Sequence, residues 1–123
     1  MKTSELTGAA LDWAVAMSLK QSGEDYTLAV DTDIDGTKRV NYGGMYPEWS
    51  SNWAEGGEII EREGITVSCT DGVWVAYRTE TLFDDDKEHE HQRGETPLIA
   101  AMRCYVASKL GDEVDVPEQV NRC

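Results

Sequence analysis

Aromatic and glycine residues gather in one stretch, residues 41–65, and their types suit the binding of a small planar molecule. The stretch contains two tyrosines, two tryptophans and two Gly-Gly pairs. Aromatic rings offer flat apolar faces with polar edges, and glycine lets a backbone approach a ligand closely. The residues on which this predicted binding surface depends are Tyr46, Trp49, Trp53, Gly56 and Gly57, joined by Trp74 further along the chain.

Gly56 and Gly57 precede the sequence EIIER, which predicts a short helix that opens at the glycine pair. Free backbone N–H groups at a helix start bind anions, and Trp53, just upstream, could stack on a base. Together these features favour a nucleotide-like ligand. Glu55 and Glu58 oppose an anion, however, and the same residues would equally form a structural turn beside core tryptophans.

Three arginines are candidates to neutralise a phosphate, because the guanidinium group offers a planar fork of hydrogen-bond donors. They are Arg62, Arg78 and Arg103. Each would serve equally well in a surface salt bridge. Arg62 and Arg78 complete the predicted ligand-binding set.

The motif DTDIDG at 31–36 resembles the start of a calcium-binding loop, in which carboxylates alternate along the chain. The match then fails, because position twelve is Tyr42 instead of a bidentate glutamate. A cross-strand pair between Asp33 and Lys38 explains the spacing equally well. The sequence therefore predicts no metal site here.

The charged run DDDKEHEHQRGE at 84–95 has no hydrophobic period and predicts an exposed or mobile loop. His89 and His91 have ligand-type side chains, but a loop of this kind offers them no rigid support. A metal-dependent hydrolase that uses these histidines and the Asp31 cluster ranks last among the functions considered. No nucleophile motif, HExxH pair or phosphate loop is present, so the sequence predicts no cofactor and gives no support for an enzyme.

A net charge of −13, from 11 basic and 24 acidic side chains, disfavours direct binding of nucleic acid. The same charge could instead present a DNA-like field to a basic protein partner. Cys69, Cys104 and Cys123 are an odd number and widely spaced, which fits reduced thiols inside a cell. No segment approaches the ~20 apolar residues of a membrane span.

The periodicity predicts a helix over residues 5–20 and a second one that begins after Thr96 and Pro97 and stops at Gly111. Two hairpins are expected between the helices. The first joins residues 26–30 to 37–42, and the second joins residues 65–70 to 73–78 through Asp71-Gly72. This second turn would place Cys69 opposite Trp74 and Val67 opposite Ala76.

These elements predict one α+β domain over residues 1–123, with a small antiparallel sheet of two hairpins covered by an N-terminal and a C-terminal helix. The apolar side chains available exceed what one thin sheet and two helices can cover. The competing side chains are Trp49, Trp53, Val73, Val75, Tyr77 and Tyr105. A homodimer would provide the missing cover, and one wall of the ligand pocket would then come from the second subunit.

Three segments, in order, resemble the NinX family of small proteins from the nin region of lambdoid bacteriophages. They are KTSELTGAALDWAVA, NWAEGGEIIEREGI and TPLIAAMRCYVASKLGDEVDVP. The resemblance implies a phage protein made in the cytoplasm of an infected bacterial host, and it carries no assigned chemistry. The family pattern usually has proline after the Gly-Gly pair, where this chain has Glu58.

The leading hypothesis is a non-catalytic phage accessory protein that binds a small nucleotide-like host molecule, in a pocket formed by the aromatic residues and a nearby arginine. Sequestration of such a molecule would blunt a host defence signal. The alternative is an acidic interaction protein, or DNA mimic, that occupies the basic face of a host or phage DNA-binding protein. The run at 84–95 would contribute to that role.

Overall fold

The computed structural model describes residues 1–78 and 85–120. The helices and strands follow one another as α1 (Gly8–Gln21), β1 (Leu28–Thr32), β2 (Lys38–Tyr42), α2 (Trp53–Glu63), β3 (Ile65–Thr70), β4 (Val73–Arg78), β5 (Gln92–Gly94) and α3 (Pro97–Leu110). Short 3-10 turns lie at Thr3–Glu5, Asp85–Glu90 and Glu118–Val120.

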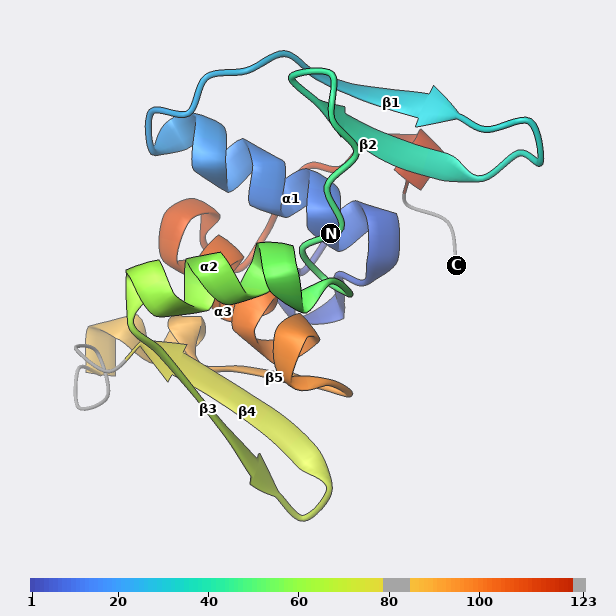
Figure 1. Ribbon diagram of the computed structural model, residues 1–123. Coiled ribbons are helices and arrows are strands. Elements are labelled where there is room, and N and C mark those ends of the chain that lie inside the picture. The colour runs from blue at the N-terminus through green and yellow to red at the C-terminus, as the bar shows by residue number, and fades with distance from the viewer. Residues whose placement is uncertain (79–84, 121–123) are drawn as a thin grey trace.

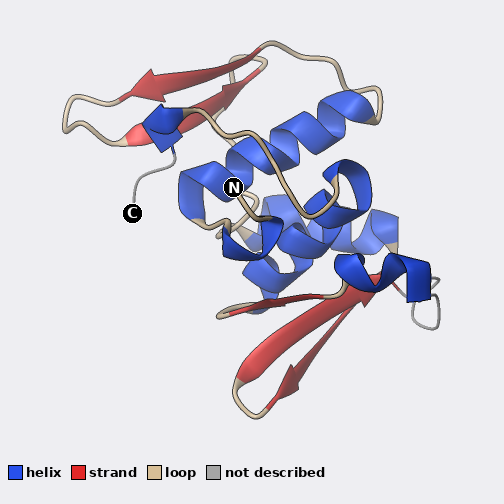
Figure 2. Ribbon diagram, turned by 180° about the vertical axis from the view of Figure 1, so that it is seen from behind, coloured by secondary structure: helices blue, strands red, loops and turns tan. Residues whose placement is uncertain are grey.

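The helices form a central layer between two separate antiparallel sheets (Figures 1 and 2). The β1–β2 hairpin covers α1, while α3 packs on α1 and on the three-stranded sheet β3–β4–β5. The predicted α+β class is confirmed. The two hairpins do not share one sheet, because they cover opposite sides of the helical layer.

The α3 helix begins and ends where the sequence predicts. The Thr96 hydroxyl accepts a hydrogen bond from the Ile99 N–H at 3.1 Å, and Pro97 occupies the first turn, where it needs no N–H partner. Gly111 follows the last turn with φ +87°, a conformation that glycine adopts without steric cost. This helix is buried along most of its length, so it is the centre of the core.

The α1 helix begins at Gly8, three residues later than predicted, because Thr3–Glu5 forms a separate 3-10 turn. Its apolar side chains pack against α3. The core residues that α1 and α3 contribute include Leu11, Val15, Leu19, Met102, Tyr105 and Val106.

The second hairpin has the predicted register, with Cys69 opposite Trp74 and Val67 opposite Ala76. The turn between its strands requires positive φ angles, which are +53° at Asp71 and +80° at Gly72. The sheet then gains a third strand, β5, that pairs with β4.

The α2 helix begins at Trp53, so the prediction that it opens at the glycine pair is wrong. The Asn52 side chain caps it by accepting a hydrogen bond from the Ala54 N–H at 2.9 Å. The Gly56 N–H donates to the Asn52 carbonyl at 2.8 Å and is not available to an anion. Gly56 is required for packing instead, because a Cβ there would lie 2.5 Å from the Trp49 carbonyl oxygen.

The prediction of a loop without regular structure is wrong for most of residues 85–94, although the side chains of Asp86, Lys87 and Arg93 are exposed as predicted. Asp85–Glu90 forms a 3-10 turn, and Gln92–Gly94 forms β5. Glu90 and Gln92 are 2% and 7% exposed, so part of this charged run belongs to the folded body. Pairing of β5 with β4 is a tertiary contact, which the local hydrophobic period does not reveal. Residue 84 lies outside the described residues.

Candidate functional site

The pocket that best matches the sequence prediction lies between the C-terminal end of α1, the end of β2, the segment after β2, and α2. We call it the aromatic pocket; its volume is about 400 Å³. Its walls are formed by Leu19, Glu24, Tyr26, Tyr42, Gly43, Met45, Pro47, Trp49, Glu55, Glu58, Ile59 and Arg62.

Three aromatic rings give one wall of this pocket its shape. Tyr26 and Tyr42 meet edge to face, with ring centroids 5.4 Å apart and an interplanar angle of 88°. Tyr42 meets Trp49 in the same manner at 6.1 Å. Tyr42 and Trp49 are each 8% exposed, whereas Tyr26 is 56% exposed and presents its ring to the pocket. The buried rings therefore hold Tyr26 in a position to stack on a ligand.

The Tyr42 hydroxyl donates a hydrogen bond to the backbone carbonyl of Glu24. This bond ties β2 to the turn after α1 that carries Tyr26. Burial raises the pKa of Tyr42, and the nearby carboxylates of Glu24 and Asp25 raise it further, so the phenol stays a neutral donor at physiological pH.

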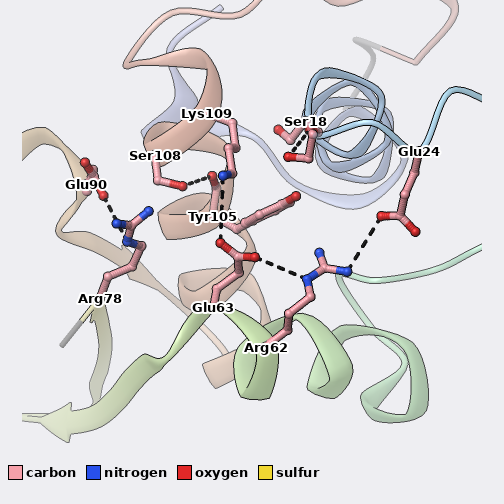
Figure 3. A network of polar contacts seen from close by, with 10 residues as sticks. Ser18, Glu24, Arg62, Glu63, Arg78, Glu90, Tyr105, Ser108 and Lys109 are labelled. Carbon is pink, nitrogen blue, oxygen red and sulfur yellow. Dashed lines mark hydrogen bonds and ion pairs between the residues drawn. The ribbon is translucent and has the colours of Figure 1, made fainter. Parts of the chain in front are cut away.

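Arg62 is the cation of the aromatic pocket, and its guanidinium group is held between two carboxylates (Figure 3). Its Nη1 atom lies 3.6 Å from Glu24, and its Nε atom lies 3.2 Å from Glu63, which Lys109 approaches at 3.9 Å from the other side. The side chain is 47% exposed, so a ligand can reach it. Glu24, Glu55 and Glu58 also line the pocket, which gives its walls an excess of negative charge.

A second pocket, of about 340 Å³, lies between the start of α1, β2 and the segment 46–51. We call it the Asp12 pocket. Its lining consists of Gly8, Ala9, Asp12, Thr37, Lys38, Arg39, Val40, Tyr46, Pro47, Glu48, Ser50, Ser51 and Ile99. Pro47 lines both pockets, so the segment that contains it separates the one from the other.

Asp12 is a buried acid in this second pocket, only 7% exposed. Its Oδ1 atom accepts a hydrogen bond from the Ser50 N–H at 2.9 Å. Burial raises the pKa of the carboxyl to about 7, against the hydrogen bonds from Ser50, and the carboxylates of Glu48 and Glu55 raise it further. The sequence reasoning did not select Asp12. The available signal was an acid within the apolar stripe of a predicted helix.

Comparison with known protein families identifies the family of the chain. The family model described as "Bacteriophage P22, NinX" matches residues 2–109, which is most of the chain. The protein belongs to the bacteriophage NinX family. The resemblance seen in the three sequence segments is thereby confirmed. No curated protein matches the chain.

The NinX-family fold brings together only part of the predicted ligand-binding set. Trp49 and Arg62 face the same aromatic pocket from the segment before α2 and from α2 itself. Tyr46 lines the Asp12 pocket, where its hydroxyl donates to Asp31 at 2.7 Å. Trp53 stands at the start of α2 with 56% of its surface exposed, and it lines neither the aromatic pocket nor the Asp12 pocket.

The structure places Trp74 and Arg78 on β4, in the sheet on the other side of α3 from the aromatic pocket. Trp74 is partly buried and packs against the core. Arg78 lies 3.6 Å from the buried carboxylate of Glu90, well separated from Arg62 (Figure 3). Arg103 instead donates to the backbone carbonyls of Leu6 and Arg93. These side chains therefore support the NinX fold rather than the walls of the aromatic pocket.

Tyr26 is the pocket residue that sequence reasoning missed. It follows the turn after α1 and precedes β1, with no local motif around it. It meets Tyr42 because β2 returns to the end of α1, and this is a long-range contact that a local pattern does not encode.

The aspartates of the DTDIDG motif stabilise the first hairpin of the NinX protein. Asp31 accepts hydrogen bonds from Asn41 and Tyr46, and Asp35 accepts one from the Thr37 N–H. The predicted partner of Asp33, Lys38, is wrong, because Asp33 pairs with Arg39 instead. Across the described residues, no cluster of three metal-ligating side chains is present; the side chain of His89 lies outside them.

No helix in the described part of the chain is long and apolar enough to cross a membrane.

Proposed function

We propose that this NinX-family protein binds, without catalysing a reaction, a small nucleotide-like molecule of the bacterial host in its aromatic pocket. The carrying observation is that Trp49 and Arg62, selected from the sequence for ring binding and charge, line one pocket with Tyr26 and Tyr42. Sequestration in the cytoplasm of the infected host would remove the molecule from a defence pathway of the cell.

The charges of the pocket narrow the class of ligand. Three carboxylates face one guanidinium group, which is already shared between Glu24 and Glu63. Like charges repel a chain of phosphates, while an uncharged ring and ribose meet no such penalty. The ligand is therefore a nucleoside-type molecule with few charges, such as a nucleoside or cyclic mononucleotide, and it binds through its ring.

Thermal unfolding with added ligand tests this proposal. A nucleoside or cyclic mononucleotide at 100 times its dissociation constant stabilises the folded protein by about 2.7 kcal/mol. The corresponding nucleoside triphosphate is expected to bind more weakly, because of the carboxylates. If no nucleoside or cyclic nucleotide raises the melting temperature, the proposal fails.

Two tyrosine variants locate the binding. Tyr26→Ala removes the exposed ring of the pocket, and the loss of stacking is expected to cost about 1–3 kcal/mol of binding free energy. Tyr46→Ala removes a ring of similar exposure outside the aromatic pocket and is expected to leave the affinity unchanged. Isothermal titration of both variants provides the comparison.

We also propose that the protein forms a homodimer through the exposed start of α2. Two of the side chains thought to need a partner, Trp49 and Tyr105, are covered within the chain by α2 and the neighbouring elements. Trp53 remains 56% exposed, and Met45 is 70% exposed. Exposed rings of this kind are typical anchors of protein interfaces.

Trp53→Ala is therefore expected to weaken self-association at least tenfold, and to weaken ligand binding if the partner contributes a pocket wall. Asp33→Ala, on the first hairpin, is expected to leave both unchanged. Light scattering at micromolar concentration measures the association. A monomer in the wild type, with and without ligand, contradicts the proposed dimer.

The alternative role, as an acidic partner of a basic protein, is supported by the net charge of −13. The acidic run at 84–95, which was expected to contribute to that role, is partly folded into the protein, since Glu90 is buried against Arg78. Salt distinguishes the two roles, because binding through surface charge weakens steeply with ionic strength and ring stacking does not.

A further inference from the structure

The three rings of the aromatic pocket stand at steep angles to one another. The planes of Tyr26 and Tyr42 meet at 88°, and those of Tyr42 and Trp49 meet at 67°. The faces of an aromatic ring carry partial negative charge. Sites built from several aromatic rings are the ones that proteins use to hold organic cations. The angles between these rings therefore suit a positively charged ligand.

Carboxylates without a cationic partner lie beside these rings. Glu55 and Glu58 line the pocket from α2, and neither forms an ion pair within the part of the chain that the structure describes. One oxygen of Glu55 accepts a hydrogen bond from the Glu48 N–H at 3.1 Å, while Glu58 is exposed. A cation that enters the pocket would be attracted to both carboxylates.

Arg62, the cation that lines this pocket, does not balance the charge of these two carboxylates. Its guanidinium group lies 3.6 Å from Glu24 and 3.2 Å from Glu63 (Figure 3). These two acids already offset its single positive charge. The negative charge of Glu55 and Glu58 is thus left for a ligand to neutralise.

From these observations we propose that the ligand of the aromatic pocket is a nucleoside whose base carries a positive charge. Nucleosides alkylated on a ring nitrogen, such as 1-methyladenosine and N7-methylguanosine, belong to this class. The charged base packs against Tyr26 in the corner formed by the rings, and Glu55 and Glu58 provide the opposite charge. This inference rests on the proposed function and specifies the chemical class of its ligand.

Isothermal titration at neutral pH tests the inference with two matched pairs of ligands. 1-Methyladenosine is protonated at this pH, while its isomer N6-methyladenosine carries the same methyl group without the charge. N7-Methylguanosine and guanosine form the second pair. In at least one pair, the cation is expected to bind about tenfold more tightly than the neutral nucleoside, because only the cation gains from the ring faces and the carboxylates.

The outcomes distinguish this inference from the function on which it rests. If both neutral nucleosides bind as tightly as their cationic partners, the inference is overturned and the proposed function stands. If none of the four binds, the inference is overturned, and the proposed function fails with it only if cyclic mononucleotides also give no thermal shift. Spermidine, a cation without an aromatic ring, is expected to bind more weakly than the preferred nucleoside. Tighter binding of spermidine would show that charge alone is recognised and would overturn the inference.

Two glutamine variants of α2 locate the preference for a cation. Glu58→Gln removes a carboxylate of the pocket and is expected to reduce this preference about threefold, with little change in the affinity for the neutral isomer. Glu61→Gln removes the same charge from an exposed position on the same helix, outside the aromatic pocket, and is expected to leave the preference unchanged. Equal effects of the two variants would show that the net charge of the protein, and not the pocket, attracts the cation. That result would overturn the inference.

Discussion

Gly56→Ala is expected to destabilise the folded protein by about 1–3 kcal/mol, the usual cost of an overpacked core position. A Cβ at residue 56 would lie 2.5 Å from the Trp49 carbonyl oxygen and 2.6 Å from Cδ2 of Leu98. The first of these atoms belongs to the backbone and cannot rotate away. The segment that carries Trp49 would have to move, so the shape of the aromatic pocket would change as well.

The neighbouring glycine is a matched control. A Cβ at Gly57 would meet only the Trp53 ring, at 3.9 Å, which is an ordinary contact. Alanine favours a helix over glycine, so Gly57→Ala is expected to stabilise the protein by about 0.5–1 kcal/mol. Urea unfolding of the two variants measures the difference. Equal effects of the same sign would show that helix propensity, and not the contact with Trp49, dominates at this site.

Asp12→Asn is expected to change how stability depends on pH. The pKa of Asp12 is about 7 in the folded protein, against an ordinary pKa of 3.8 for an aspartate side chain. Because the folded state binds the proton more tightly, ionisation favours the unfolded state as pH rises through this window. At about 1.4 kcal/mol per pKa unit, the wild type loses up to about 4 kcal/mol of stability between pH 4 and pH 8.

The asparagine variant cannot ionise, so its stability relative to the wild type is expected to increase steadily from pH 4 to pH 8. Asp25→Asn is the control, since the hydrogen bond and charge of Lys20 lower the pKa of Asp25. At a pH above the ordinary pKa of aspartate, the ionised Asp25 side chain stabilises the folded state, so its removal gives no gain in stability as pH rises. Parallel stability curves for wild type and Asp12→Asn would contradict the proposed effect of burial.

The elements that the sequence predicted accurately are those with signals close together in the chain. Thr96, Pro97 and Gly111 set the ends of α3, and Asp71-Gly72 sets the register of the second hairpin. The start of α2 was misplaced because adjacent glycines usually interrupt helices. Gly56 lies inside the helix for a tertiary reason, the close approach of the Trp49 backbone.

The candidate binding residues also divide into those with a local signal in the sequence and those whose place depends on tertiary contacts. Trp49 and Arg62 could be selected because their side chains suit a ring and a charge, and they lie near one another in the sequence. Trp74 and Arg78 suit the same chemistry, yet α3 separates their strand from the pocket. The importance of Asp12 depends on its burial under the segment that contains Ser50, which no local pattern describes.

Residues 1–3 are hydrogen-bonded to residues 111–114, which lie after α3. The Met1 amino group donates to the Val114 carbonyl at 2.9 Å, the Thr3 hydroxyl donates to the Gly111 carbonyl at 2.7 Å, and Lys2 forms a β-bridge with Glu113. During synthesis at about 5–20 residues per second, these partners emerge from the ribosome roughly 6–23 s after the first residues. The apolar face of α1 also remains uncovered until α3 has been synthesised and can pack on it. A chain truncated before residue 97 would expose that face to chaperones and proteases of the host. Production of the folded protein therefore depends on complete synthesis of α3.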